Sequence, residues 1–239
     1  MFKVLAKIWK MRWIFRSLLS SVYFNFRMLP VNQAWKLPIL LYKPKLCSLK
    51  GKITVCGNIR FGMVRLGCFR VPFYPNNGIK IYVDGNLVFY GDCNIGNNSV
   101  LSVSESGSLS FGRFFSATAA LKLTCSNEIC FGEHVTVGWD NIFMDSDFHR
   151  LSKLNMGGYT KGYGKIEIGS DNWFACRNII LKNTLTPNKC TIAAQTVLNK
   201  DYRKFGEYVV IGNNNTVSVL AKDVWLDSND PESRKIEIK

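Results

Sequence analysis

The chain has 239 residues, of which 47% are hydrophobic and 13% aromatic, a composition that excludes a disordered binding arm and suits one large domain or an elongated repeat. Its 31 Lys and Arg residues outnumber 17 Asp and Glu residues, giving a formal net charge of +14, and 15 of the basic residues precede the first carboxylate, Asp84. A cationic N-terminal third on a nearly neutral body indicates a polyanionic neighbour, either nucleic acid or an anionic membrane surface.

Residues 1–45 are expected to form a basic, amphipathic helical segment. Its first 30 residues interleave six cations with aromatic rings: Lys3, Lys7, Lys10, Arg12, Arg16 and Arg27 among Trp9, Trp13, Phe15, Tyr23, Phe24 and Phe26. Such a helix can lie in the plane of an anionic membrane, or it can pack its aromatic side on the body of the protein, and both interpretations are open. The longest charge-free run, residues 17–26, is half of the roughly 20 residues that a spanning helix needs. Arg12 and Arg16 also interrupt the apolar stretch that a signal peptide requires.

Eight cysteines are scattered along the chain without a CxxC pair, and there are only two histidines. Metal and redox sites usually need close cysteine pairs backed by histidines, so no metal is expected. In the absence of a secretion signal, we expect reduced thiols in the cytoplasm that act as small apolar groups.

From Ile95 onward, the sequence repeats with a period of six residues. The period begins with IGNNSV at Ile95, returns as FGRFFS and then as FGEHVT, VGWDNI and FMDSDF, and runs through five hexads from Ile168. The first positions of this last run are Ile168, Phe174, Ile180, Thr186, Ile192 and Leu198, all apolar except Thr186. A period of six fits neither a helix nor the alternation of a strand. It predicts short strands and sharp corners, with three sides closing a coil of about 18 residues in a parallel β-solenoid.

The period is interrupted after Phe148. Residues 149–165, HRLSKLNMGGYTKGYGK, are rich in Gly, Lys and Tyr and contain no hexad, which predicts an excursion loop off the coil. Insertions in solenoids often lie on the working face. The expected domains are the segment 1–45, a hexapeptide-repeat β-helix over 46–220 that carries the loop 149–165, and a C-terminal tail over 221–239.

The hexads, the run WDNIFMDSDFH ahead of the loop, and IEIGSDNWFACRNIILKNTLTPNKCTIAAQTVLNKD resemble the left-handed β-helix acyltransferases. Within that family the chain is most similar to the maltose/galactoside-type O-acetyltransferases, in the branch encoded with bacterial surface-polysaccharide biosynthesis. The resemblance covers roughly residues 50–225, with residues 129–201 as its specific core. It implies an all-β, left-handed parallel β-helix, a homotrimer, and acetyl-CoA bound in the groove between neighbouring solenoids. The chain departs from the family pattern at Phe174-Ala175, at Thr186 and in the stretch IGNNNTVSVLAKDVW.

His149 is the expected general base. Attack of a sugar hydroxyl on a thioester needs a base that titrates near neutrality, and the resemblance places the family's catalytic histidine at the end of DSDFH. Asp145 and Asp147 alternate with it, so the three side chains share one face if the strand runs on. One of the two carboxylates is then expected to orient the imidazole; the alternative is that both satisfy turn amides. His134, in GEHV, is expected to be an exposed corner residue.

Four further residues are expected to form the binding site. Asn141 occupies a fifth hexad position, where it can hydrogen-bond the acceptor or cap a turn. Trp173 is expected at an exposed corner, and the resemblance implies that it walls the active site near the pantetheine arm. The resemblance also implies that the small side chains of Ala175 and Ala193 let the pantetheine lie against the coil.

Lys200 and Arg203, in LNKDYRK, are placed to contact the CoA phosphates or are simply solvated.

The chain is thus predicted to be an acetyltransferase acting on a sugar hydroxyl of a surface-glycan precursor. N-acetylation of an amino sugar and a non-catalytic scaffold at the membrane are the alternatives. A zinc carbonic anhydrase on this solenoid would need three histidines, and the chain has no recognised nucleic-acid module. We expect a cytoplasmic protein. The basic N-terminal segment additionally predicts peripheral contact with the inner face of the plasma membrane.

Overall fold

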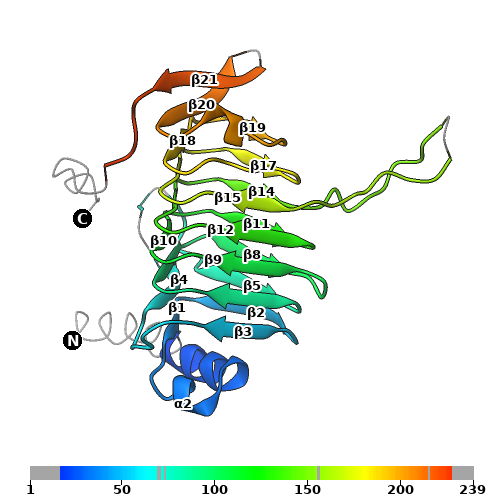
Figure 1. Ribbon diagram of the computed structural model, residues 1–239. Helices are drawn as coiled ribbons and strands as arrows, with labels where there is room; N and C mark the ends of the chain where they lie inside the picture. Colours follow the sequence, from blue (N-terminus) through cyan, green and yellow to red (C-terminus); the bar gives the residue numbers. More distant parts are fainter. Residues whose placement is uncertain (1–16, 69–70, 73, 155–156, 215, 228–239) are drawn as a thin grey trace.

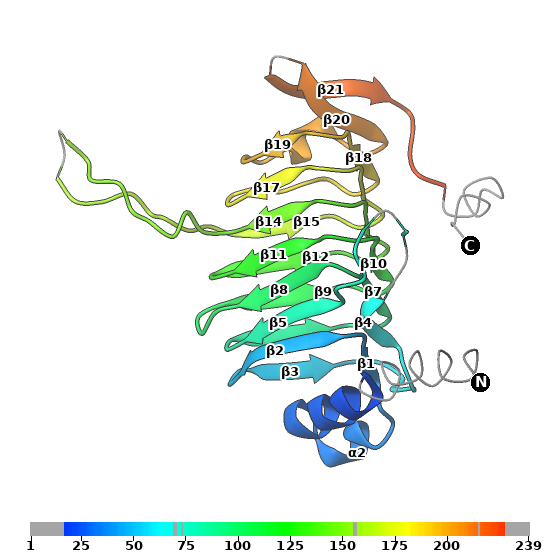
Figure 2. The same ribbon diagram turned by 180° about the vertical axis from the view of Figure 1, so that it is seen from behind.

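The computed structural model describes residues 17–68, 71–72, 74–154, 157–214 and 216–227. In these residues the chain passes in turn through three parallel sheets, which we call sheets A, B and C, so that β1, β2 and β3 begin the three sheets and β4 returns to the first. Figures 1 and 2 show the resulting column of stacked coils, with a helical end and a C-terminal end. The predicted parallel, repeating β architecture is present; its left-handed sense stays a prediction.

The three sheets differ in their number of strands. Sheet A is nine-stranded and consists of β1 (Ile39–Leu41), β4 (Val64–Cys68), β7 (Cys93–Gly96), β10 (Phe115–Ala117), β13 (Thr136–Val137), β16 (Trp173–Phe174), β18 (Cys190–Ile192), β20 (Val209–Asn214) and β21 (Thr216–Lys222). Sheet B is seven-stranded and consists of β2 (Pro44–Leu49), β5 (Ile79–Val83), β8 (Ser99–Val103), β11 (Lys122–Cys125), β14 (Ile142–Met144), β17 (Ile179–Leu181) and β19 (Val197–Leu198). Sheet C is five-stranded and consists of β3 (Lys52–Val55), β6 (Asn86–Phe89), β9 (Ser108–Phe111), β12 (Glu128–Phe131) and β15 (Ile166–Ile168).

The core of the column is built from the first hexad positions. All six first positions of the run from Ile168 to Leu198 are buried, as are Phe111, Phe131 and Phe143 upstream. Phe131 stacks on Phe111 with ring centroids 5.3 Å apart and meets Phe143 edge-on at 5.0 Å. The period of six therefore places one large apolar side chain per side of each coil in a continuous core, as the sequence predicts.

The corners are stabilised by buried fifth-position side chains. The Asn172 amide donates to the Thr186 hydroxyl at 2.8 Å and accepts from the Cys190 backbone N–H at 2.8 Å, so it links two successive coils. The Thr186 hydroxyl also accepts from the Gly169 N–H at 3.0 Å. Thr186 departs from the apolar pattern because its buried hydroxyl accepts these two hydrogen bonds from the preceding coil, whose donors would otherwise lack a partner.

A helix over residues 17–28 and α2 (Val31–Ala34) cover the N-terminal end of the column, at the lower end of Figure 1. Phe24 is fully buried and Met28 is nearly so. Residues 17–28 therefore pack one side under the first coil, as in the second of the two interpretations of this segment, while Tyr23 and Phe26 on the other side are exposed. Residues 1–16, which hold most of the predicted segment's cations, lie outside the described residues.

Polar side chains of the same helix protect the edge of sheet A. The Asn25 amide donates to the Ile39 carbonyl at 2.7 Å and accepts from the Ile39 N–H at 3.1 Å. The Ser21 hydroxyl accepts from the Leu41 N–H at 2.8 Å. Because β1 is the outermost strand, its unpaired backbone groups would otherwise be an open edge for another chain.

The opposite end closes differently. β20 and β21 form the antiparallel pair of sheet A, and β21 covers the last parallel strand. The coils start at Ile39, before the expected boundary at residue 46, and β21 ends at Lys222, within the expected tail 221–239. No helix in the described part of the chain is long and apolar enough to cross a membrane.

Candidate active site

Residues 145–154 and 157–165, between β14 and β15, leave the column as the two sides of a long antiparallel arm (Figures 1 and 2). The two sides of the arm pair at Ser146–Tyr163 and again at Ser152–Tyr159. The predicted excursion is therefore present, but it begins at Asp145 and not at residue 149, because β14 ends at Met144.

His149 lies on the outgoing side of this arm, between the two bridged positions, and its side chain is exposed. Gly162 lies opposite: a Cβ at this position would be 2.6 Å from the His149 carbonyl oxygen, so glycine allows the two sides to approach. Among the described residues, the imidazole makes no hydrogen bond or ion pair. It is therefore free to contact a substrate.

The two aspartates before His149 have different surroundings. Asp145 is fully buried, and its carboxylate accepts from the backbone N–H groups of Ser126 and Asn127, both at 2.7 Å. Asp147 is exposed and forms an ion pair with Lys182 of the next coil. The sequence analysis did not single out Lys182, because its contact depends on which coils stack.

The expectation that Asp145, Asp147 and His149 share one face of a strand is wrong. The strand does not run on: β14 ends at Met144, and Phe148 has a φ of 58°, which turns the chain just before His149. Asp145 consequently points into the column while His149 points to solvent. Asp145 satisfies turn amides, as the alternative interpretation has it.

Asn141 lies buried at the corner between sheets A and B. Its amide donates to the carbonyls of Ala175 at 2.8 Å and Gly138 at 3.0 Å, and its oxygen accepts from the Asn178 N–H at 3.1 Å. These bonds match the turn-capping interpretation of Asn141. Ala175 and Ala193 follow one another in successive coils at the same corner, because Ala175 donates its N–H to Ile192 and Ala193 follows that residue.

Trp173 lies in strand β16 and its side chain is half-buried. The expectation that it stands at an exposed corner is therefore wrong. In sheet A it stands in register with Thr136 on one side and Thr191 on the other. Its ring therefore lies on the outer face of sheet A, one residue before the core residue Phe174.

The basic residues after β19 differ in how freely they can bind an anion. Arg203 is held by Asp201, with Nη2 to Oδ2 at 2.7 Å and Nε to Oδ1 at 3.0 Å, and this pairing lowers the pKa of Asp201. Lys200 is exposed, and its ammonium has no partner in the described part of the chain. Leu185 donates its N–H to the Lys200 carbonyl at 3.1 Å and thereby fixes this corner to the coil below.

The expected site residues thus form two separate groups within one chain. Asp145, Asp147, His149, Lys200 and Arg203 lie at or near the corner between sheets B and C, where β14 and β19 end. Asn141, Trp173, Ala175 and Ala193 lie on sheet A or at its corner with sheet B. A single copy does not bring the base and the Trp173 face together.

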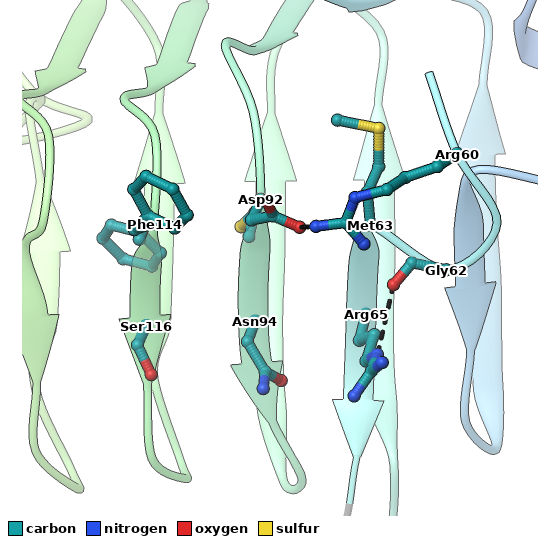
Figure 3. Close-up of a pocket in the computed structure, with 10 residues that line it drawn as sticks. Arg60, Gly62, Met63, Arg65, Asp92, Asn94, Phe114 and Ser116 are labelled. Carbon is teal, nitrogen blue, oxygen red and sulfur yellow. Dashed lines mark hydrogen bonds and ion pairs between the residues drawn. The ribbon is translucent and has the colours of Figure 1, made fainter. Parts of the chain in front are cut away.

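The outer face of sheet A also carries a pocket of about 320 Å³, drawn in Figure 3. Arg65, Asn94 and Ser116 lie in register on β4, β7 and β10, and Arg60 forms an ion pair with Asp92 beside them. Guanidinium groups next to an amide and a hydroxyl suit a ligand rich in oxygen atoms. The sequence analysis missed this pocket because its residues are far apart in the chain and share no motif.

A second excursion, between β4 and β5, is tied to the column. Tyr74 donates its hydroxyl to Asp140, three coils along the chain, and burial together with this hydrogen bond raises the pKa of Tyr74 to about 12. His134 is exposed at its corner, as expected, with a φ of 55°, and stacks on Phe114 at 4.7 Å. The eight cysteines are free, and no group of His, Cys, Asp or Glu able to hold a metal occurs among the described residues.

No family model matches the chain, and no curated protein sequence matches it. Among solved structures it is similar to the polySia specific acetyltransferase NeuO, with 16% identity over 79% of this chain and 91% of that chain and a TM-score of 0.44. It is similar to the polysialic acid O-acetyltransferase OatWY, with 15% identity over 81% and 95% and a TM-score of 0.43. It is also similar to AntD, an N-acyltransferase from Bacillus cereus in complex with dTDP and coenzyme A, with 13% identity over 82% and 86% and a TM-score of 0.44. TM-scores in this range do not assign an activity to the chain.

Proposed function

We propose that the chain is an acyltransferase of the left-handed β-helix type, which moves an acetyl group from acetyl-CoA to a sugar hydroxyl of a surface-glycan precursor. The observation that carries the proposal is the position of His149. It ends the motif DSDFH, stands on the arm that interrupts the coils, and presents an exposed imidazole that makes no hydrogen bond to any residue the structure describes. In this proposal the enzyme acts in the cytoplasm, where acetyl-CoA is available.

His149 supplies the proton transfer. As the acceptor oxygen attacks the thioester carbonyl, the imidazole removes the hydroxyl proton, and it later returns that proton to the departing thiolate. An imidazole has the unperturbed pKa that such a two-way transfer near neutral pH requires. Asp147 is the carboxylate nearest in sequence that reaches solvent, and it is our candidate for positioning His149, with Lys182 holding Asp147 on the adjoining coil. Asp145 is left with its structural role.

The site is completed by a second copy of the chain in a homotrimer. Two features support this proposal: the base and the Trp173 face lie on different parts of the column, and the arm carries exposed apolar side chains far from its own core. Phe148, Leu151, Leu154 and Tyr159 are all exposed on the arm. An arm that packs these side chains against sheet A of a neighbour would bring His149 towards Trp173. A stable, active monomer at micromolar concentration in light scattering would contradict this arrangement.

The residues present fit acetyl-CoA to a limited extent. Lys200 offers an exposed cation for a phosphate, and Ala175 and Ala193 present small side chains at one corner, beside Trp173. Arg203 can contribute only by sharing its guanidinium with Asp201. We therefore assign the first phosphate contact to Lys200.

The test is thiol release from acetyl-CoA over a panel of simple sugars, nucleotide sugars and lipid-linked oligosaccharides. We expect release that depends on an acceptor hydroxyl, and His149→Ala should slow it by about 10²–10⁴-fold. His134→Ala, at an exposed corner of the same column, is the matched control and should keep the wild-type rate. Near wild-type turnover by His149→Ala would show that the base is assigned wrongly, and release that requires an amine would identify an N-acetyltransferase.

A further inference from the structure

The helix over residues 17–28 has an apolar face that points away from the column. Leu19, Tyr23 and Phe26 are spaced i, i+4 and i+7 and are all exposed, on the side of the helix opposite the buried Ser21 and Met28. Trp35 extends this face: its ring meets that of Phe26 edge-on with centroids 5.1 Å apart. Trp35 is 74% exposed although indole is a side chain that proteins usually cover.

Val31, on α2 one turn before Trp35, is 61% exposed and widens this apolar surface. We call these five residues, Leu19, Tyr23, Phe26, Val31 and Trp35, the end face. It forms the surface of the molecule beyond the first coil, where Figures 1 and 2 show the helices as the last layer of the column. Contiguous apolar surfaces rimmed by polar residues mark interaction sites.

Exposed basic side chains surround the end face. In a solenoid each coil lies next to the coil that follows it in sequence, so the described residues of the first coil and of the helices beneath it contain no acidic side chain. The first carboxylate of the chain, Asp84, comes from the second coil and accepts from the Ser48 hydroxyl. Arg27 and Lys36 flank the end face and are exposed, and the first coil adds the exposed Lys45 and Lys52. Residues 1–16 contribute five further cations to the chain. This charge is complementary to an anionic surface and repels a second end face.

The end face is also fixed in place. Hydrogen bonds of Asn25 to Ile39 and of Ser21 to Leu41 hold the opposite side of the helix against β1. The helix therefore does not need to fold or turn when it binds, and the aromatic rings are presented at low entropic cost.

From these observations we propose that the end face docks the protein on an anionic lipid bilayer, with Tyr23, Phe26 and Trp35 at headgroup depth and Arg27 and Lys36 at the lipid phosphates. Aromatic and leucine side chains beside arginine and lysine are the composition of interfacial helices. The column would then stand on the membrane by its N-terminal end. This inference does not depend on acetyl transfer, since none of these residues belongs to the proposed active site.

Vesicle co-sedimentation of the full chain tests the proposal, with vesicles of neutral phosphatidylcholine and vesicles that also contain phosphatidylglycerol. We expect binding to the anionic vesicles that weakens as salt rises, because the Debye length falls from about 10 Å at 0.1 M to about 3 Å at 1 M. Arg27→Gln with Lys36→Gln should lower the affinity by about fivefold per cation, since each is worth about 1 kcal/mol near an anionic surface.

The decisive variant is Tyr23→Ser with Trp35→Ser. Both side chains are exposed, so the fold should persist, as circular dichroism can verify, while vesicle affinity falls at least about tenfold. Leu220→Ser with Val224→Ser, which are exposed at the C-terminal end of the column, is the matched control, and its vesicle binding should equal that of the wild type. Unchanged binding by the Tyr23/Trp35 variant would overturn the proposal. So would a change of oligomeric state in this variant without lipid, which would identify the end face as a contact between copies.

Discussion

Along β15, β16 and β17, the inward side chains Ile168, Phe174 and Ile180 are at most 2% exposed, whereas Phe148, Leu151 and Leu154 on the arm are 59%, 68% and 97% exposed. The coil residues are held by three sheets and by buried corner amides. The two sides of the arm pair with each other at Ser146–Tyr163. Past Asp145, the arm is joined to the column by the ion pair of Asp147 with Lys182 and, where it returns, by the Asn183 N–H that donates to the Lys165 carbonyl. The arm therefore adds little to the stability of the column, and its side chains remain available for contacts outside the chain.

This comparison predicts a separation of effects. Substitutions of buried residues, including Asp145 at the base of the arm, should change the free energy of unfolding and affect transfer only through the folded fraction. Substitutions of exposed arm residues, or of Lys182 that holds the arm, should leave unfolding nearly unchanged and act on transfer or assembly. The variants below probe that separation at four places.

Phe174→Ala should have the largest effect on stability. The ring is fully buried and contacts Phe143 edge-on at 5.3 Å, so its removal should destabilise the protein by about 3–5 kcal/mol. Urea unfolding followed by circular dichroism measures the loss. Ile179→Ala, on the outer face of the neighbouring strand β17, is the control and should change stability by at most about 0.5 kcal/mol. Equal losses in the two variants would mean that the inward positions do not form the core.

Asp145→Ala should have the next largest effect, because Asp145 stands where the arm leaves the coil. The variant leaves the N–H groups of Ser126 and Asn127 without acceptors, a loss of about 1–3 kcal/mol. Glu105→Ala, exposed at a corner between the same two sheets, should be nearly neutral. The rate of acetyl transfer per folded molecule should stay close to that of the wild type. A fully folded but inactive Asp145→Ala protein would restore Asp145 to the catalytic group.

The sequence predicted the coils well because a period of six translates directly into burial. First positions became core residues, including Thr186, whose side chain is polar but buried and hydrogen-bonded. The arm was predicted from the loss of the period. The residue at which the arm begins was not predicted correctly. Asp145 and Asp147 continue the alternation of a strand in the sequence, whereas strand β14 ends at Met144 and the backbone turns at Phe148.

The site was harder to predict than the fold, since its partners come from different coils. The pairing of Lys182 with Asp147 and the register of Arg65, Asn94 and Ser116 depend on which coils stack, and no local motif encodes that. The N-terminal helix was ambiguous for a related reason. Its composition fits both a membrane surface and a protein core, and in the structure the helix has one buried side and one exposed apolar side.

The second excursion offers a contrast with the arm, because Tyr74 ties it to the column. The pKa of Tyr74 is raised from 10.0 to about 12 in the folded protein, first by burial and then by its hydrogen bond to Asp140. The unfolded chain therefore loses this proton at lower pH than the folded chain does. The stabilisation is fully present below pH 10 and is lost as the pH rises through about 12.

Thermal unfolding at pH 8 to 12 checks this expectation. Tyr74→Phe should lower stability at pH 8 and flatten the fall in melting temperature above pH 10. Tyr159→Phe removes a hydroxyl from the arm and serves as the control, with a pH profile like that of the wild type. If Tyr74→Phe keeps the wild-type slope, the excursion is not held by its hydrogen bond to Asp140.

The smallest expected change in stability comes from Lys182→Gln, which removes the ion pair between the arm and the column. Both side chains are partly exposed, so unfolding should change by only about 0–1 kcal/mol, and less at high salt. The arm should nevertheless lose a constraint on its base, and trypsin should cut more rapidly after Arg150, Lys153 and Lys161. Lys122→Gln, on the outer face of sheet B, should leave that cleavage rate unchanged. Because Asp147 would be released together with the arm, we also expect a lower rate of transfer with unaltered acetyl-CoA binding; an unchanged rate would mean that the ion pair does not position His149.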